Sequence, residues 1–325
     1  ELVDDAVVVD TGSTDRTVDV ARAAGARVVL HRWTDDFAAA RNAGLAEIRD
    51  GWVLVLDADE RLVPSSAAAL RAAIDQGQVD AGRVALHDAD TLNADPREVA
   101  SGRHRRGEPW LAPRLLRHTP DLAYEGAVGE DLRSWLRAGR RIATLEADVA
   151  HYGDVPELAP WRDRGDLRRR LLERRCAERP SAPRAHALLA RELLRRGDEV
   201  GGRDRAERAW TLVSALPPDR REDTDVVLAA TLHAYQCLAR EDLDHAADVL
   251  ARTVDWGLAH PSLDLLAGAL LECLALGSTS PGEQAEALAG SRAAYQRCLR
   301  QADRRYEARP LPGATSWAAE TRLAT

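Results

Sequence analysis

The stretch Trp52-Val53-Leu54-Val55-Leu56-Asp57-Ala58-Asp59-Glu60 decides the fold class. Its unbroken apolar run is typical of a strand that is covered on both faces. A similar run, Val7-Val8-Val9-Asp10, lies upstream, and a third covers residues 27–30. Ala-rich segments at 17–24 and 37–48 alternate with these runs. The alternation predicts an α/β domain with a Rossmann-like, largely parallel sheet.

Two of the predicted strands end in acidic residues, at Asp10 and at Asp57-Ala58-Asp59. In an open α/β sheet, ligands bind beyond the carboxyl ends of the strands. An Asp-x-Asp segment can bind a hard divalent cation, and the cation can carry a diphosphate. Each segment alone is also consistent with an ordinary turn, since Gly, Ser, Thr and Asp are common there. The two together favour a binding edge.

The sequence pattern changes near residue 155. From about Pro160 onward, apolar residues recur at helical spacing, as in Leu188, Leu189 and Leu193. Breaks at 196–198, 240–242 and 276–278 each precede another Ala-rich segment, which is typical of tetratricopeptide-like paired helices. We therefore expect an α/β domain over residues 1–155, a helical-repeat domain over 156–308, and an extended tail over 309–325, where prolines follow Arg309.

The composition excludes several chemistries. All 45 basic residues are Arg, so the chain has no Schiff-base lysine and no phosphate-loop lysine. A formal net charge of −8 argues against a nucleic-acid partner. The 4 cysteines lack CxxC spacing, which indicates buried thiols and not a zinc site or disulfides. We see no export signal or membrane-spanning stretch and expect a cytoplasmic protein; abundant Ala and Arg suggest a bacterial source.

Several sequence blocks together resemble family 2 glycosyltransferases. They are residues 8–17, residues 25–28, Trp33 with residues 36–42, and residues 52–60. A GT-A domain followed by a tetratricopeptide-like region is a layout similar to that of bacteriocin S-glycosyltransferases. The resemblance implies a metal-dependent, inverting transfer of a sugar, hexosyltransferase-like, from a nucleotide-sugar donor, with UDP-sugars favoured. It also implies a first strand before Leu2, which the given sequence does not contain.

The resemblance assigns roles on the donor side of the site. Asp57 would face the donor ribose, and Asp59 would coordinate Mn²⁺ or Mg²⁺ on the diphosphate. Asp10 and Thr11 would lie against the nucleoside, although Thr11 replaces an Asp of many relatives. The further donor-binding residues that it implies are Arg41, Asn42 and Arg114, and Arg41 could alternatively be a solvated helix charge.

The resemblance continues on the acceptor side, through residues 113–117, 124–131 and 151–153. The second block usually ends in Val-His-Glu, and here Gly129 stands in place of the His. An inverting displacement needs a carboxylate that deprotonates the acceptor, and we assign this role to Glu130, with Asp131 as the substitute. His151 would complete the metal shell, with a purely structural histidine as the alternative. The acceptor could be a glycan, a lipid or a peptide.

Three functions remain open at this stage. The favoured one is a glycosyltransferase whose helical region grips the acceptor or forms a homodimer. The second is a non-catalytic interaction protein with a degenerate transferase domain, and Gly129 and the expected missing strand are the arguments for it. The third is a haloacid-dehalogenase-type phosphatase, since residues 54–59 fit its strand and DxD opening. Arg61, where such enzymes have Thr or Val, and the absence of Lys argue against it.

Overall fold

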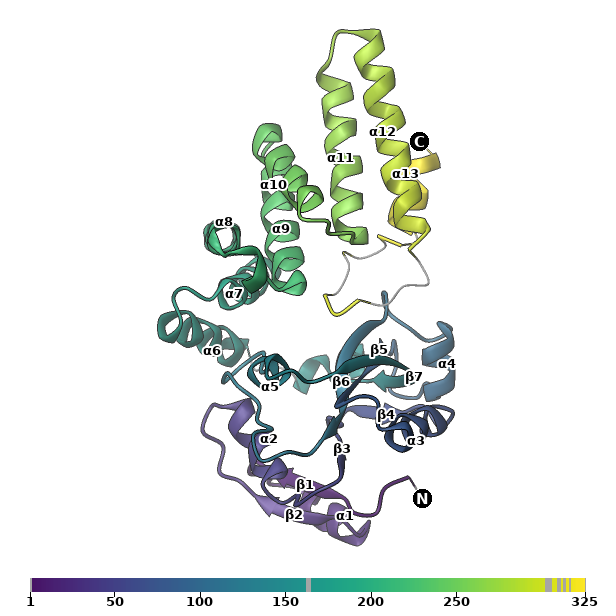
Figure 1. Cartoon of the computed structure of the whole chain (residues 1–325), viewed down its shortest axis with the longest axis vertical. Coiled ribbons are helices and arrows are strands. Elements are labelled where there is room, and N and C mark those ends of the chain that lie inside the picture. Colours follow the sequence, from purple (N-terminus) through teal and green to yellow (C-terminus); the bar gives the residue numbers. More distant parts are fainter. Residues whose placement is uncertain are drawn as a thin grey trace. The chain divides into compact units, whose positions relative to one another are not determined.

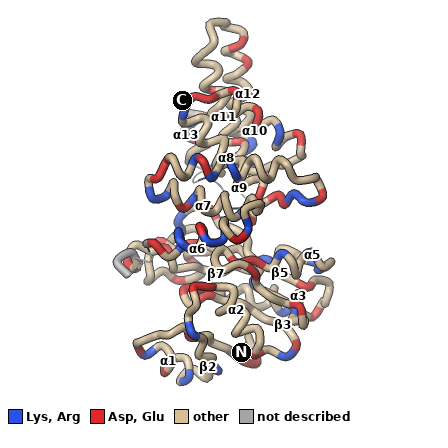
Figure 2. Tube along the Cα trace, turned by 90° about the vertical axis from the view of Figure 1, so that its left-hand side faces the viewer, with Lys and Arg blue, Asp and Glu red and all other residues tan. Residues whose placement is uncertain are grey.

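The computed structural model describes residues 2–161, 165–301, 306–308, 311, 314–315 and 317–324 (Figure 1). The chain divides into two compact units, one of residues 1–106 and 111–171 and the other of residues 107–110 and 172–325. Acidic and basic residues are interspersed along both units (Figure 2). Among the described residues, no helix is both long enough and apolar enough to span a membrane.

The first unit opens with the alternation that the sequence predicts. Its elements are β1 (Val7–Asp10), α1 (Thr17–Ala23), β2 (Arg27–Leu30), α2 (Phe37–Leu45) and β3 (Trp52–Leu54). Strands β1 and β2 pair in parallel, from Val7 opposite Arg27 to Asp10 opposite Leu30. Strand β3 ends before the apolar run does, and a turn closes at Asp57, whose carbonyl accepts from Glu60 N. The α/β fold is thereby confirmed.

A second sheet has the strand order β3-β6-β5-β7-β4. Its other strands are β4 (Glu60–Leu62), β5 (Ala81–Asp88), β6 (Trp110–Arg117) and β7 (Ile142–His151). Strand β5 runs parallel to β7, whereas β3 is antiparallel to β6 and β4 is antiparallel to β7. The sheet is therefore mixed, and not largely parallel as expected. Strand direction depends on long-range pairing, which leaves no trace in the apolar runs.

The helices of this unit fix the segments that carry the polar residues. Helices α3 (Ser66–Gln76) and α4 (Pro96–Ser101) pack on β7. Helix α2 begins after Asp36, whose side chain accepts from Ala39 N, so a regular N-cap sets its first turn. Helix α5 (Arg133–Arg137) places the buried Trp135 in one apolar cluster with Leu116 and Leu45. That cluster supports the segment between β6 and α5.

The second unit is helical, as expected. Helix α6 (Gly165–Glu178) leads to α7 (Pro183–Arg195), α8 (Glu199–Ala215), α9 (Asp223–Leu238), α10 (Leu243–Asp255), α11 (Pro261–Gly277) and α12 (Pro281–Leu299). Neighbouring helices pack as the pairs α7 with α8, α9 with α10, and α11 with α12. The sequence breaks at 196–198 and 240–242 lie between the members of a pair, and the break at 276–278 covers the end of α11. Gly197 and Glu241 take positive φ at two of these turns, 80° and 60°.

The expectation of an extended tail over residues 309–325 is wrong for its last part. Helix α13 covers Trp317–Ala324 and packs beside α12, with Ala319 in a cluster with Tyr295 and Cys298. The prolines that suggested an extended chain end at Pro312, and the sequence after them is rich in good helix formers. Residues 309, 310, 312, 313, 316 and 325 lie outside the described residues.

Candidate functional site

The carboxylate of Asp10 is hydrogen-bonded to the backbone of the turn that follows β1. Asp10 is 7% exposed, and its side chain accepts from the backbone N–H groups of Gly12 and Ser13. Hydrogen bonds from Ser13 and Gly12 lower the pKa of Asp10 below its usual value. Thr11 is exposed beside it. Asp10 therefore orders this turn, and Thr11 is the member of the pair that is open to a ligand.

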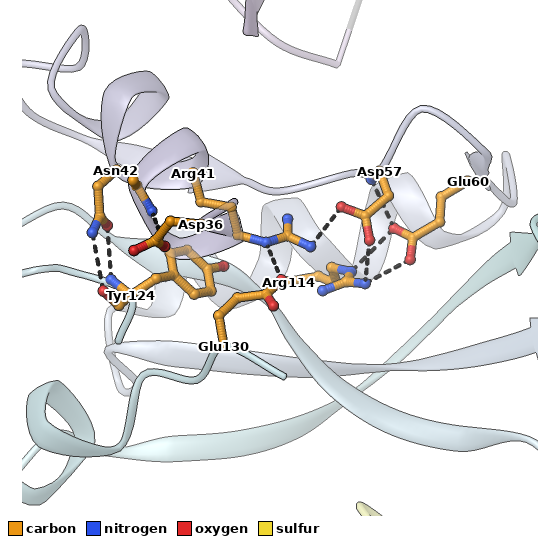
Figure 3. Close-up of polar contacts among 9 residues, drawn as sticks. Asp36, Arg41, Asn42, Asp57, Glu60, Arg114, Tyr124 and Glu130 are labelled. Carbon is orange, nitrogen blue, oxygen red and sulfur yellow. Dashed lines mark hydrogen bonds and ion pairs between the residues drawn. The ribbon is translucent and has the colours of Figure 1, made fainter. Parts of the chain in front are cut away.

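Arg41 links two of the predicted site residues (Figure 3). On α2, its Nη2 lies 2.7 Å from Asp57 Oδ1, and its Nε donates to Glu130 Oε1 at 2.7 Å. Burial opposes the charged form of Arg41, but Asp57 and Glu130 outweigh this and raise its pKa. The alternative of a solvated helix charge is therefore excluded. One guanidinium joins Asp57 and Glu130, the carboxylates that the sequence analysis assigns to the donor side and the acceptor side.

Arg114 lies beneath Asp57 and does not face solvent. Its guanidinium binds Glu60 through two nitrogens, with Nε donating to Oε2 at 3.1 Å and Nη2 to Oε1 at 2.5 Å. Nη2 also lies 3.4 Å from Asp57 Oδ2. The Arg114 and Glu60 side chains are 9% and 1% exposed. Arg114 is thus a buried support for Asp57, and the structure gives it no open face for a donor.

Asp57 and Asp59 point to different partners, so the two carboxylates do not form one cation site. Asp57 is held by Arg41 and Arg114, whereas Asp59 Oδ2 lies 3.6 Å from His151 Nε2. Residues 58–59 form a turn before β4, so the regular alternation of a strand does not apply to them. The metal-ligand role expected of Asp59 stays a prediction, and Asp57 lies in different surroundings.

Asn42 binds the chain that carries Glu130. Its Nδ2 donates to Tyr124 O at 3.0 Å, and Tyr124 N donates to its Oδ1 at 2.8 Å. The Tyr124 ring lies 5.3 Å from the Arg41 guanidinium, and its buried hydroxyl has no partner within the described chain (Figure 3). The Asn42 amide thus positions the segment 124–131 against α2.

Glu130 and Asp131 differ in their surroundings. The Glu130 side chain is 15% exposed and bonds to Arg41 inside the network of Asp57. Asp131 Oδ1 instead accepts from Arg133 N at 3.2 Å, at the beginning of α5. Gly129 before them has φ 59°, a left-handed conformation that favours glycine. Of the two carboxylates, Glu130 is the one that the fold brings to the other site residues.

His151 ends β7 between two carboxylates. Its Nδ1 lies 2.8 Å from Asp88 Oδ1, and its Nε2 faces Asp59. Burial alone would lower the pKa of the ring, but the hydrogen bonds with Asp59 and Asp88 outweigh this and raise it to about 10. The surroundings of His151 thus favour positive charge. Asp88, at the end of β5, fixes the ring orientation in the way that carboxylates orient metal-binding histidines.

The same region fits a divalent cation. One ligand atom from each of Asp88, His151 and Asp154 lies within 4.8 Å of the others. Asp59, whose side chain is 44% exposed, is not a member of this group but faces His151 Nε2 at 3.6 Å. Gly153 leaves the room, because a Cβ there would overlap Asp59 Oδ2 and His151 Nε2. Carboxylate oxygens with one imidazole are a donor set that suits Mn²⁺ or Mg²⁺.

Three residues of this site were missed in the sequence. Asp88 follows the apolar run of β5 and carries the same strand-end signal that singled out Asp10 and Asp57. Glu60 directly follows the Asp-x-Asp segment, but only the fold reveals its pairing with Arg114. Asp154 follows the predicted His151-Tyr152-Gly153 block and has no sequence signal of its own.

Comparisons with known proteins agree with this architecture. Residues 2–123 match the family model for glycosyl transferase family 2. Over 205 residues the chain is 30% identical to a TPR repeat-containing protein of Synechococcus elongatus, an alignment that covers 61% of this chain and 48% of that protein. The chain thus spans about half the length of this curated relative. Apart from residues 107–110, the family match therefore lies within the N-terminal unit, and a helical, tetratricopeptide-like unit follows it.

Proposed function

We propose that the N-terminal unit is a metal-dependent, inverting glycosyltransferase that moves a sugar from a nucleotide-sugar donor, with a UDP-sugar favoured, to a glycan, lipid or peptide acceptor. One observation carries the proposal: Arg41 binds Asp57 and Glu130 at 2.7 Å each. This contact brings the carboxylate expected on the donor side next to the carboxylate expected on the acceptor side. A transferase needs both at one place.

The donor side would use groups that stay open in the structure. Thr11 is exposed beside the ordered turn of Asp10, and the Asp57 side chain is 35% exposed above Arg114. Asp59 and His151, with Asp88 and Asp154 beside them, would hold Mn²⁺ or Mg²⁺. Such an ion, when bound, neutralises the charge of a departing diphosphate. Arg114 holds Asp57 in place from beneath, and Asn42 holds the segment that carries Glu130.

The acceptor side would use Glu130 as the base. Its carboxylate takes the proton from the acceptor nucleophile as the new bond to the anomeric carbon forms. The bond from that carbon to the diphosphate oxygen breaks on the opposite face, which inverts the configuration. The hydrogen bond from Arg41 Nε to Glu130 Oε1 keeps this carboxylate oriented.

The test is donor binding. UDP-glucose, UDP-N-acetylglucosamine and GDP-mannose, each with Mn²⁺, should raise the melting temperature, since a ligand at about 100 times its Kd stabilises the native state by about 2.7 kcal/mol. Asp59→Asn should remove the Mn²⁺-dependent shift. Asp50→Asn, at an exposed carboxylate of the same unit, should keep it.

Other outcomes would favour the other functions. If no sugar nucleotide gives a metal-dependent shift, the transferase proposal is wrong and a helical-repeat interaction protein is favoured, in line with the name of the curated relative. Turnover of p-nitrophenyl phosphate that Asp57→Asn abolishes would instead support a phosphatase.

A further inference from the structure

A small hollow adjoins the Asp59 side of the site. It has a volume of about 180 Å³ and is lined by Ala58, Asp59, Arg61, Leu92, Tyr152 and Leu158. All of these residues belong to the N-terminal unit. Asp59 belongs to this lining, and its Oδ2 lies 3.6 Å from His151 Nε2, so the hollow adjoins the place where the donor diphosphate is expected.

Arg61 gives this hollow an available positive charge. It is exposed on β4, and its guanidinium lies 4.2 Å from the centre of the Tyr152 ring. Tyr152 is 2% exposed, and its hydroxyl donates to Ala94 O at 2.8 Å, so the ring is a fixed platform. Arg41 and Arg114 are neutralised by carboxylates, whereas no carboxylate within the described part of the chain pairs with Arg61.

The size of the hollow limits what it can hold. Its volume corresponds to about six water molecules. Sites that enclose a whole drug-sized ligand are larger, at roughly 300–1,000 Å³, so a nucleoside diphosphate does not fit. Leu92, Leu158 and the Tyr152 ring give it an apolar wall, which a diphosphate does not need. A single sugar unit or amino-acid side chain with one anionic group matches both the wall and Arg61.

We propose that this hollow is the acceptor subsite and that Arg61 selects acceptors whose end unit carries a carboxylate or a phosphate. In naming the occupant an acceptor, the inference rests on the proposed transferase function. Nothing in the resemblance to family 2 glycosyltransferases assigns Arg61 or this hollow. The Tyr152 platform holds the guanidinium at the wall, so the anionic group and the apolar face of the acceptor are read together.

The test compares ligands that differ in one group. Methyl β-glucuronide and methyl β-glucoside share a sugar ring, and so do glucose 6-phosphate and glucose. We would measure the Kd of all four for the full chain by calorimetry, with Mn²⁺ and UDP present and again without them. At least one anionic ligand should bind about tenfold more tightly than its neutral counterpart, because a charge-assisted hydrogen bond is stronger than a neutral one. Added salt should reduce the difference.

Arg61→Gln should remove that preference, and Arg49→Gln, at an exposed arginine outside the lining of the hollow, should keep it. The Kd for UDP with Mn²⁺ should stay within about twofold in both variants. If Arg61→Gln weakens UDP binding and leaves the sugar preference unchanged, Arg61 contacts the donor diphosphate and the inference is overturned.

The outcomes for the subsite and for the proposed function are separable. Equal affinity for anionic and neutral ligands overturns the subsite, whether or not UDP binds. If the chain binds no UDP, the transferase function is contradicted, and the acceptor role of the hollow is overturned with it. A preference for anionic ligands measured without UDP would then show only that Arg61 binds anions.

Discussion

His151 and His260 are both largely buried, yet their surroundings shift their pKa values in opposite directions. His151, at the end of β7, lies between Asp59 and Asp88, which raise its pKa to about 10 against the effect of burial. His260, before α11, lies between backbone groups: Ser262 N donates to its Nδ1, and its Nε2 donates to Ala308 O. Burial lowers the pKa of His260 to about 4.

The difference shows what each region is built to do. The strand ends around His151 gather carboxylates that are partly open to solvent, and such surroundings attract a cation. The beginning of α11 uses a neutral ring as a helix cap, with the Tyr306 ring packed at 4.6 Å against it. A buried histidine is therefore a candidate ligand where carboxylates surround it and a structural residue where backbone groups do.

The largest effect should come from removing Glu130, the proposed base in the N-terminal unit. Glu130→Gln should reduce donor hydrolysis, with water as the acceptor, by roughly 10²–10⁴-fold, because a positioned base contributes about that much. The Kd for the donor should stay within about twofold, since Gln can still accept from Arg41. Asp131→Asn is the matched control. If Asp131→Asn is the slower variant, the base is Asp131.

The next effect concerns the buried ion pair of Arg114 and Glu60. Arg114→Leu leaves Glu60, whose side chain is 1% exposed, buried without its ion-pair partner. Removing one member of a buried pair costs about 3–5 kcal/mol. The free energy of unfolding should fall by that amount in guanidinium denaturation. The double variant Arg114→Leu with Glu60→Gln should recover part of the loss, and a loss below about 1 kcal/mol would contradict the buried pair.

For His260, we predict that the free energy of unfolding depends on pH. The folded pKa of His260 is about 4 and its unfolded value is 6.5, so the unfolded chain binds the extra proton between these values. Stability is fully present above pH 6.5 and is lost as the pH falls toward 4. Between pH 7 and pH 5, the loss should be roughly 2 kcal/mol.

The control for this pH dependence is His260→Asn, which keeps a capping acceptor but does not titrate. Denaturant unfolding followed by the helical far-UV circular dichroism signal would report mainly on the helical unit, which contains the longest described helices. The variant should lack the part of the acid loss that His260 contributes. Equal acid sensitivity of both proteins would show that His260 is not the group that titrates.

The smallest effect should come from one methyl group beside His151. Gly153→Ala places a Cβ against Asp59 Oδ2 and His151 Nε2, the ends of two side chains that can move apart. Mn²⁺-dependent donor binding should weaken by about tenfold, or about 1.4 kcal/mol, with little change in stability. Gly282→Ala, where the nearest atom is 3.9 Å away, is the control. Unchanged Mn²⁺ dependence in Gly153→Ala would place the cation elsewhere.

Local signals predicted the order of elements and pointed to several residues that the fold brings together, whose roles stay predictions. The apolar runs located β1, β2 and β3, and the acidic ends of β1 and β3 pointed to Asp10, Asp57 and Asp59. Pairings between distant segments could not be predicted. Glu60 meets Arg114 across 54 residues, and Asp88 meets His151 across 63. The mixed sheet was missed for the same reason, because no local pattern encodes which strands become neighbours.

The two hydrogen bonds between Asn42 and Tyr124 have a mechanical consequence. They clamp α2, which carries Arg41, to the chain leading to Glu130, so sliding of one past the other would break both bonds. Beyond the clamp, Gly126 and Gly129 take φ of 92° and 59°, so backbone freedom in this segment is concentrated at these glycines. A rearrangement on ligand binding would therefore rotate the backbone at Gly126 and Gly129, while α2 and the chain around Tyr124 would move together.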